Sequence, residues 1–390
     1  MSKGTVLSNG DSNLFMERNS ISVAENFLTL DHYPTLEKKI DDAEKNDLPP
    51  FSHFTDEEVL YYYVHHQKNV DQNKNKSDGT KREYIRELLN FAKNIVSYAN
   101  EIDIDIEDVK EGSLFKSLSP RHIKRYQEWM VQREPYINGR KSAYAAATIA
   151  RKTSIIRSFL KFLYKNDYVV TDLTARMASA TVSSDERPDR DLGPSEALEI
   201  LHFFKEENHP ILFGILHVLI TTGIRNNEFC HARVCDLSYD AARREYFLRI
   251  HGKGNKKRTV PIKPKVFDSI VEFRKARGLG TTLNRNDVSP LFINSEGNAY
   301  RSTYLSRYIN KAVKRTGLDC VKNRLNPIAP HTLRHSFAII SYHSGADVYR
   351  IMRSLGHEKI ETTQIYLQKE FEKNDHAVHL WDKSLLKDFV

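Results

Sequence analysis

Apolar residues recur at helical spacing over much of the chain. Between Thr55 and Met177 they lie three or four positions apart in several stretches, which predicts helices near residues 56–68, 80–99, 119–133 and 143–165. Thr55, with Glu58 three residues later, and Ser119, with Pro120 directly after it, are typical of helix starts. The pattern therefore predicts a helical domain over residues 55–178.

Residues 179–191 interrupt this pattern. Their sequence, SATVSSDERPDRD, is poor in large apolar side chains and rich in serine and charge, so we interpret it as an interdomain linker. From residue 192 to 390 helical spacing resumes, with one hairpin predicted from strands at 246–251 and 259–262. We expect a mainly α fold with a small β-sheet (α+β), in which residues 1–54 form an extension before the two domains.

Charge is distributed unevenly along the chain. The formal net charge is +8 and the isoelectric point is about 9.1. Residues 1–50 contain nine acidic and five basic residues and so carry −4, which leaves +12 on the remaining 340 residues. A basic body favours a polyanionic partner such as nucleic acid. Because the acidic N-terminal extension offers few phosphate contacts, we expect its deletion (residues 1–50) to leave DNA binding intact.

The helix predicted at 143–165 has two contrasting faces. Large apolar residues (Ile149, Ile156, Phe159, Leu160 and Leu163) share one face, and basic residues occupy the other. This basic stripe consists of Arg151, Arg157, Lys161 and Lys165. Such a stripe suits a phosphate backbone, although it is also the usual pattern of a solvated face. We regard the four residues as candidate DNA-binding residues.

Other features restrict the function classes. The odd set Cys230, Cys235 and Cys320 contains no C-x-x-C pair and is typical of a reducing compartment. No secretory signal or membrane-length apolar run is evident, so we expect a cytoplasmic, nucleoid-associated protein. No G-x-x-x-x-G-K-[ST] motif is found, so nucleotide hydrolysis is not expected.

Five short motifs follow one another in the second domain. They are T-G-I-R-N-N-E (222–228), G-K-G-N-K-K-R (252–258), P-H-T-L-R-H (330–335), L-G-H (355–357) and T-T-Q-I-Y (362–366). The final tyrosine, Tyr366, follows His357 by nine residues. Together, in this order, they resemble the signature of the tyrosine recombinase family, which includes phage integrases and Xer-type enzymes. The resemblance covers the whole second domain and, more weakly, residues 55–178.

The chemistry of metal-free phosphodiester cleavage explains these residue types. It requires a nucleophile, positive charge at the phosphoryl group and a proton for the leaving oxygen. A guanidinium offers a planar fork to two phosphate oxygens, so Arg225 and Arg334 are predicted to clamp the phosphate. His331, three residues before Arg334 on a predicted helix, suits a general base near the tyrosine hydroxyl, and His357 suits a hydrogen-bond donor to the phosphate.

The resemblance assigns the remaining roles. It implies a site-specific recombinase that joins DNA through a 3′-phosphotyrosine on Tyr366 and a Holliday junction, without cofactor, metal or ATP. It makes Lys253 the general acid for the 5′-oxygen, and Glu228 is expected to orient the basic cluster. A helical core-binding (SAM-like) domain and the catalytic domain would clamp double-stranded DNA. The implied assembly is a homo-tetramer on two DNA sites, formed alone or with a paralogous recombinase.

Several alternatives stay open at the level of sequence. Lys256 and Lys257 are rivals of Lys253, and Tyr342 and Tyr349 are rivals of Tyr366 by residue type. A type IB topoisomerase would use similar residues, whereas a catalytically inactive relative would lack one of them. The histidines 331, 335, 343 and 357 could suggest a metal site, but no H-E-x-x-H motif or paired carboxylate accompanies them. The target sequence and the biological role, whether chromosome or plasmid resolution, phage integration or transposition, are not determined.

The end of the chain carries a further amphipathic pattern. Val378, Trp381, Leu385 and Phe389 fall on one side of a predicted terminal helix. An apolar face of this kind requires a covering surface, either on the same chain or on a neighbouring protomer. The resemblance favours docking on the neighbour.

Overall fold

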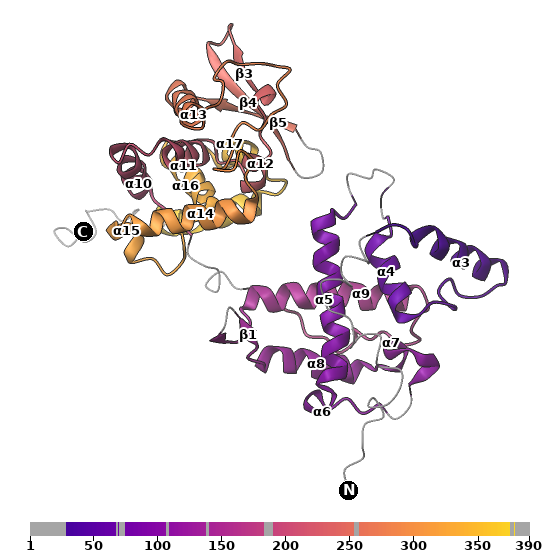
Figure 1. The fold of residues 1–390 in the computed structure, drawn as a ribbon. Coiled ribbons are helices and arrows are strands. Elements are labelled where there is room, and N and C mark those ends of the chain that lie inside the picture. Colours follow the sequence, from indigo (N-terminus) through magenta and orange to yellow (C-terminus); the bar gives the residue numbers. More distant parts are fainter. Residues whose placement is uncertain are drawn as a thin grey trace. The chain divides into compact units, whose positions relative to one another are not determined.

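The chain divides into two compact units, residues 1–187 and 188–390, in a computed structural model (Figure 1). The structure describes residues 29–67, 69, 75–106, 109–137, 140–182, 190–252, 257–374 and 378. Helices dominate both units, and a small sheet lies in the second, so the predicted fold class is confirmed. No helix among the described residues is long and apolar enough to cross a membrane.

The first unit is helical. Its elements are α3 (Tyr33–Lys45), α4 (Asp56–His65), α5 (Asp78–Ser97), α6 (Ala99–Ile102), η3 (Lys110–Gly112), α7 (Leu114–Ser117), α8 (Pro120–Gln132), a short hairpin of β1 (Tyr136–Ile137) and β2 (Arg140–Lys141), and α9 (Ala146–Lys165). All four predicted helices are confirmed, as α4, α5, α8 and α9. Thr55 caps α4 as its sequence predicts, because its side chain accepts from the Glu58 amide and the Glu58 carboxylate accepts from the Thr55 amide.

Aromatic and aliphatic side chains from these helices form one core. Tyr63, Phe91, Phe115 and Phe159 are fully buried in it. The buried Asp56 carboxylate ties α4 to α7, because it accepts from the Leu114 amide at 2.7 Å and from two hydroxyl groups. A buried carboxylate with this many donors is satisfied rather than reactive.

Helix α3 also packs into this core, although it lies N-terminal to the boundary predicted at residue 55. Leu36 and Ile40 on α3 are 3% and 9% exposed, and Phe51 and Phe54 are also buried. The apolar positions of α3 are few and lie among many charged residues. Its helical spacing therefore stood out too weakly to be recognised in the sequence.

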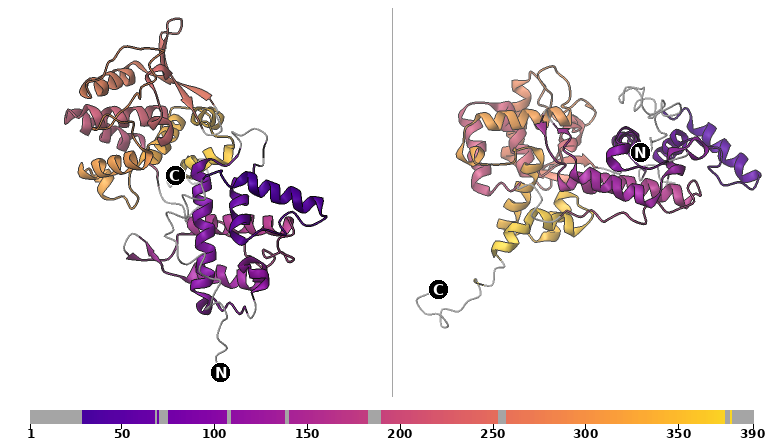
Figure 2. Two further views of the ribbon diagram at one scale, coloured as in Figure 1. Left: turned by 45° about the vertical axis from the view of Figure 1, so that its right-hand side comes forward. Right: turned by 90° about the horizontal axis from the view of Figure 1, so that it is seen from below.

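The second unit contains a buried helix surrounded by others. The elements are α10 (Pro194–Glu206), α11 (Pro210–Thr222), α12 (Asn226–Cys230), η4 (Val234–Asp236), β3 (Leu237–Asp240), β4 (Glu245–His251), β5 (Lys257–Ile262), α13 (Pro264–Ala276), α14 (Ser302–Arg315), α15 (Asp319–Lys322), α16 (Pro330–His343), α17 (Val348–Leu355) and α18 (Ile360–Asn374). Helix α11 is mostly apolar and contacts α10, α13 and α16 (Figures 1 and 2). A helix of this composition is stable when most of its surface is covered.

The three strands form an antiparallel sheet in the order β3-β4-β5 at one end of the unit (Figure 1). The predicted hairpin is confirmed as β4 and β5, paired from Tyr246↔Ile262 to His251↔Lys257. Lys253, Gly254, Asn255 and Lys256 in its turn lie outside the described residues. A smaller core joins α16, α17 and α18 and includes Ile339, Leu355, Tyr366 and Leu367.

Candidate active site

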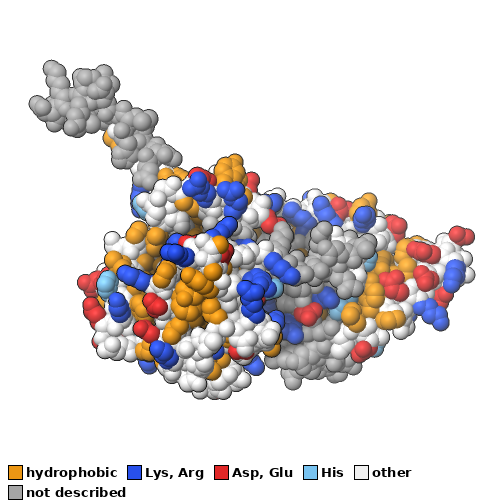
Figure 3. Space-filling model, turned by 90° about the horizontal axis from the view of Figure 1, so that it is seen from above, with side chains coloured by type: hydrophobic (Ala, Val, Ile, Leu, Met, Phe, Trp, Pro, Cys, Tyr) orange, Lys and Arg blue, Asp and Glu red, His pale blue; other side chains and the backbone are white. Residues whose placement is uncertain are grey.

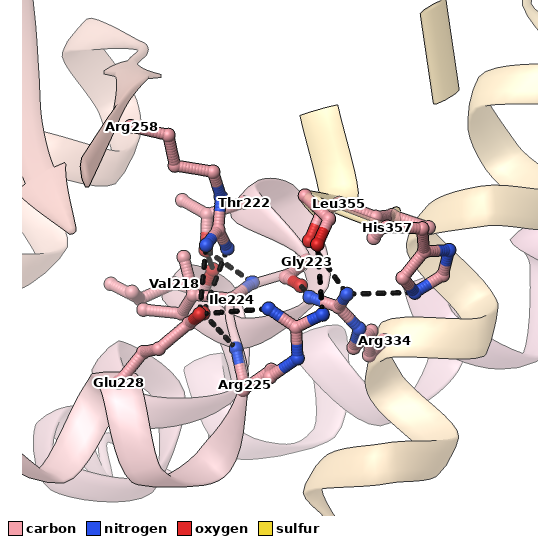
Figure 4. Close-up of polar contacts among 11 residues, drawn as sticks. Val218, Thr222, Gly223, Ile224, Arg225, Glu228, Arg258, Arg334, Leu355 and His357 are labelled. Atoms are coloured by element: carbon pink, nitrogen blue, oxygen red, sulfur yellow. Dashed lines mark hydrogen bonds and ion pairs between the residues drawn. The ribbon is translucent and has the colours of Figure 1, made fainter. Parts of the chain in front are cut away.

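The five sequence motifs meet at one place in the second unit. The turn between α11 and α12, strand β5, helix α16 and the turn after α17 contribute side chains (Figure 4). Helix α18 adds Tyr366. Six of the seven predicted catalytic residues lie together there, namely Arg225, Glu228, His331, Arg334, His357 and Tyr366. The seventh, Lys253, lies outside the described residues.

Two glycines shape the site through their backbone. Gly223 ends α11 at φ +59°, and a Cβ there would lie 2.6 Å from Cδ1 of Phe337. Gly356 ends α17 at φ +66°. Both conformations are left-handed and favour glycine. The carbonyl oxygens of these two residues accept hydrogen bonds from Arg334 and Arg225 respectively, so each helix end also positions an arginine.

Arg334 is a buried cation held by backbone oxygens. It is 2% exposed, and it donates to the Gly223 oxygen at 2.5 Å and to the Leu355 oxygen at 2.7 Å. The Tyr366 side chain lies close enough to interact with its charge. Burial lowers the pKa of Arg334 to about 10, so it remains charged at neutral pH.

Arg225, Glu228 and Arg258 form an ionic cluster. The Glu228 carboxylate accepts from the Arg225 amide at 2.7 Å and from the Arg225 guanidinium at 3.0 Å. Arg258 donates to both of its oxygens at 2.7 Å. Burial alone would raise the pKa of Glu228, but the hydrogen bonds and charges of the two arginines lower it to about 2.

Arg258 is not among the residues predicted from the sequence. A signal for it existed, because Val260 and Ile262 alternate along β5 and place Arg258 on the same inward face. A cation on an inward face requires a buried partner, and that partner is Glu228.

Three imidazoles surround the ring of Tyr366, which is 7% exposed. His335 stacks on it with ring centroids 3.7 Å apart, and His331 and His357 approach it edge-on at 5.5 and 5.1 Å. His335 is also absent from the predicted catalytic set. Its Nδ1 lies 3.9 Å from the Asp191 carboxylate at the start of the unit. The stack fixes the plane of the tyrosine ring beside Arg334.

The two predicted catalytic histidines are neutral at physiological pH. Desolvation, His335 and nearby arginines lower the pKa of His331 to about 4, although the residue is exposed at the surface. Burial and the charges of Arg334, Arg225 and Arg258 lower the pKa of His357 to about 3. A neutral His331 beside the tyrosine has the protonation state that a general base needs.

The hydrogen bonds of His357 differ from its predicted role. Its Nε2 lies 2.9 Å from the Arg334 guanidinium, and its Nδ1 lies 2.9 Å from the Thr363 hydroxyl. A guanidinium only donates, so Nε2 is the acceptor and Nδ1 carries the hydrogen. Donation to a phosphate from Nε2 would require a change of partner and tautomer.

The rival tyrosines lie in other surroundings. Tyr342 packs edge-on against Phe371, and Tyr349 is 62% exposed on α17. Of the remaining histidines, His343 is paired with the Glu370 carboxylate at 2.7 Å. Only Tyr366 among these three tyrosines contacts Arg334 and the histidines of the site in the described contacts.

Two of the four residues of the basic stripe on α9 are bound to partners in the same chain. Arg151 pairs with Glu83 and Glu87, and Arg157 donates to the backbone oxygens of Met177 and Ala178. Lys161 and Lys165 are exposed. Figure 3 shows lysine and arginine side chains interspersed with acidic ones over the face that it presents. The predicted DNA-binding role of the four residues stays a prediction.

Comparison with known proteins gives a consistent picture. Residues 190–373 match the model of the Phage integrase family. The chain is 30% identical over 241 residues to tyrosine recombinase XerC of Thermodesulfovibrio yellowstonii, covering 61% of this chain and 75% of that protein. It is also 30% identical over 230 residues to tyrosine recombinase XerD of Halalkalibacterium halodurans, covering 58% and 72%.

Solved structures share the fold. The XerH recombinase bound to difH, in its post-cleavage complex, matches with a TM-score of 0.57 and 20% identity over 77% of this chain and 79% of that one. A lambda integrase dimer bound to a core site matches with a TM-score of 0.53 and 16% identity over 80% and 77%.

Proposed function

The chain belongs to the phage integrase family of tyrosine recombinases, which cleave and exchange DNA strands, and we propose how its own residues perform that reaction. It acts as a site-specific DNA recombinase. The observation that carries the assignment of residues is the burial of Tyr366 in its own chain's site, against Arg334 and three histidines.

In the proposed cleavage step the Tyr366 oxygen attacks the scissile phosphorus. The P–O3′ bond is kept and the P–O5′ bond breaks, which leaves a 3′-phosphotyrosine and a free 5′-hydroxyl. His331 accepts the phenolic proton, and Lys253 supplies the proton of the 5′-hydroxyl, as the family resemblance implies. Arg225 and Arg334 neutralise the phosphoryl oxygens. Rejoining is the reverse reaction with a 5′-hydroxyl from the partner strand, and it needs no nucleotide because the phosphotyrosine retains the energy of the broken bond.

The proposed assembly follows the family. XerH and lambda integrase have been seen on DNA, the latter as a dimer on a core site. We propose that this protein binds double-stranded DNA as a homo-tetramer on two sites and that its C-terminal segment docks on a neighbour. Of the four apolar residues of this segment, Val378 is among the described residues, and Trp381, Leu385 and Phe389 lie outside them. A topoisomerase is not favoured, because the relatives are recombinases.

Substitution of Tyr366 by phenylalanine tests the nucleophile. A suitable probe is a nicked duplex bearing the site that the protein itself selects from a random DNA library. We expect Tyr366→Phe to bind this duplex with near-normal affinity but to form no SDS-stable protein–DNA adduct, because only the attacking oxygen is lost. Tyr342→Phe and Tyr349→Phe should form the adduct normally. An adduct from Tyr366→Phe would place the nucleophile elsewhere.

A further inference from the structure

Strand β5 carries a cation into the active site. Arg258 lies opposite Ile250 on the neighbouring strand β4, and its side chain is 16% exposed. Its Cδ and guanidinium lie against Gly356, within 3.2 to 3.4 Å of the position that a Cβ there would take. A side chain at Gly356 would therefore crowd Arg258. Arg258 itself reaches the Glu228 carboxylate (Figure 4).

Arg258 holds Glu228 more completely than Arg225 does. It donates to both carboxylate oxygens at 2.7 Å, whereas the Arg225 guanidinium reaches one oxygen at 3.0 Å. Paired, short contacts between a guanidinium and a carboxylate are the strongest form of this interaction. Glu228, with its side chain 3% exposed, thus has its main counter-ion on the hairpin rather than on its own helix.

The pairing of Arg258 with Glu228 matters because Glu228 both helps and hinders phosphate binding by Arg225. It orients Arg225 through its amide and its guanidinium, which helps the clamp. Its negative charge, however, opposes binding of a phosphate at the same guanidinium. With Arg258 present, the described groups of the site comprise three guanidinium cations (Arg225, Arg258 and Arg334) and one carboxylate, a net charge of two positive. A phosphodiester attacked by a tyrosinate becomes a dianion, so this balance matches the transition state.

We propose that Arg258 is a positioning residue that neutralises Glu228 and so leaves the charge of Arg225 available to the scissile phosphate. The inference rests on the proposed function. It assigns Arg258 no contact with DNA. Its effect on cleavage passes through Glu228 and Arg225, and it predicts that removing Glu228 compensates for removing Arg258.

A charge-compensation experiment tests this. First-order rate constants of single-turnover cleavage are measured on the selected nicked duplex with saturating protein, because such rate constants do not depend on the folded fraction. We expect Arg258→Gln to lower the rate constant by roughly 100-fold, the size seen when an oxyanion contact is lost. The double variant Glu228→Gln/Arg258→Gln should cleave at least about tenfold faster than Arg258→Gln. The side-chain amide oxygen introduced by Glu228→Gln would still orient Arg225 but would not oppose its charge. Arg258→Lys should be intermediate.

A neutral substrate provides the second arm. With a methylphosphonate at the scissile position, the reacting group carries one negative charge less, so the ratio of wild-type to Arg258→Gln rate constants should shrink. Lys263→Gln is the matched control, because it removes an exposed cation directly after the far end of β5 (side chain 70% exposed) and should cleave at the wild-type rate. Thermal unfolding and half-site binding of each variant show whether it folds.

The outcomes are distinct. If the double variant is as slow as Arg258→Gln or slower, and the methylphosphonate leaves the ratio unchanged, Arg258 serves the fold alone and the inference is wrong. If the wild-type protein forms no Tyr366-dependent adduct, the proposed function fails and the inference fails with it.

Discussion

At the scale of single residues, the two predicted clamp arginines are held in different ways. Arg334 is enclosed by backbone oxygens, whereas the side chain of Arg225 is 38% exposed and bridges Glu228 and the Gly356 oxygen. The exposed arginine is therefore the better one to alter without disturbing the fold.

Arg225→Lys should keep most DNA affinity and lose cleavage by about 100-fold or more. A single ammonium cannot reach the Glu228 carboxylate and the Gly356 oxygen while it also forms a two-point contact with a phosphate. Half-site binding and single-turnover cleavage measure the two effects. Arg350→Lys, on the exposed side of α17, should match the wild type. Near-normal cleavage by Arg225→Lys would remove Arg225 from the clamp.

The neutral histidines predict how stability depends on pH. The pKa values of His331 and His357 are lowered from 6.5 to about 4 and about 3. The unfolded chain therefore binds more protons than the folded one below pH 6.5, so the free energy of unfolding should fall as the pH drops toward 4. Urea denaturation at about pH 7 and pH 5 measures this. His357→Gln should reduce the pH dependence, and His202→Gln, at an exposed position on α10, should preserve it. If the free energy of unfolding of His357→Gln and His202→Gln depended equally on pH, the lowered pKa of His357 would be contradicted.

Six of the proposed catalytic residues could be grouped from the sequence because their motifs combine residue types that phosphoryl transfer requires. Arg258 and His335 could not be assigned in this way, since their roles arise from partners distant in sequence. Arg258 binds Glu228, 30 residues earlier, and His335 stacks on Tyr366, 31 residues later. Only the fold brings these pairs together.

At the scale of elements, the helix ends determine where the arginines lie. Gly223→Ala introduces a Cβ at a left-handed position and also into Phe337, 2.6 Å away. Gly278, after α13, has a similar φ of +68° but nothing within 4 Å of a Cβ. The pair therefore separates backbone strain from steric overlap.

We expect Gly278→Ala to cost about 1–2 kcal/mol of unfolding free energy, the usual penalty for a left-handed alanine. Gly223→Ala should cost roughly 1–3 kcal/mol more, because overpacking adds to that strain. It should also slow cleavage, since the Gly223 oxygen that holds Arg334 moves. Denaturation and single-turnover cleavage measure both. If both variants lost the same free energy of unfolding, the Phe337 side chain would move aside without a cost in stability.

Element prediction worked best where capping residues and spacing agreed. Helix α4 begins directly after Thr55, and α8 begins at Pro120. The hairpin was predictable because alternating strands flank a glycine-rich turn. Short elements such as α12 and the β1–β2 hairpin carry too few residues for a periodic signal, so the tertiary structure determines them.

At the scale of the whole molecule, each unit has its own hydrophobic core. A break in composition at residues 179–191 predicted two domains, and residues 183–189 of that segment lie outside the described residues. Helix α3 lies N-terminal to the boundary predicted at residue 55, and its buried side chains pack in the core of the first unit.

The packing of α3 changes what an N-terminal deletion should do. Tyr33 stacks on Tyr62 of α4 with centroids 5.4 Å apart, and Lys39 pairs with Glu58. Deleting residues 1–50 removes these contacts together with the buried Leu36, so loss of DNA binding by that truncation would follow from unfolding. Whether DNA binding survives this deletion therefore depends on the contacts of α3 as well as on the charge of the segment.

A point substitution tests the packing without deleting the helix. Leu36→Ala should lower the free energy of unfolding of the full chain by about 2–4 kcal/mol, because a buried leucine leaves both lost burial and a cavity. Asp41→Ala, at an exposed position on the same helix, should change it by less than about 0.5 kcal/mol. Urea denaturation followed by circular dichroism measures both, and half-site binding under native conditions should be retained in both. If Leu36→Ala were as stable as Asp41→Ala, α3 would contribute nothing to the first core, and the boundary predicted at residue 55 would stand.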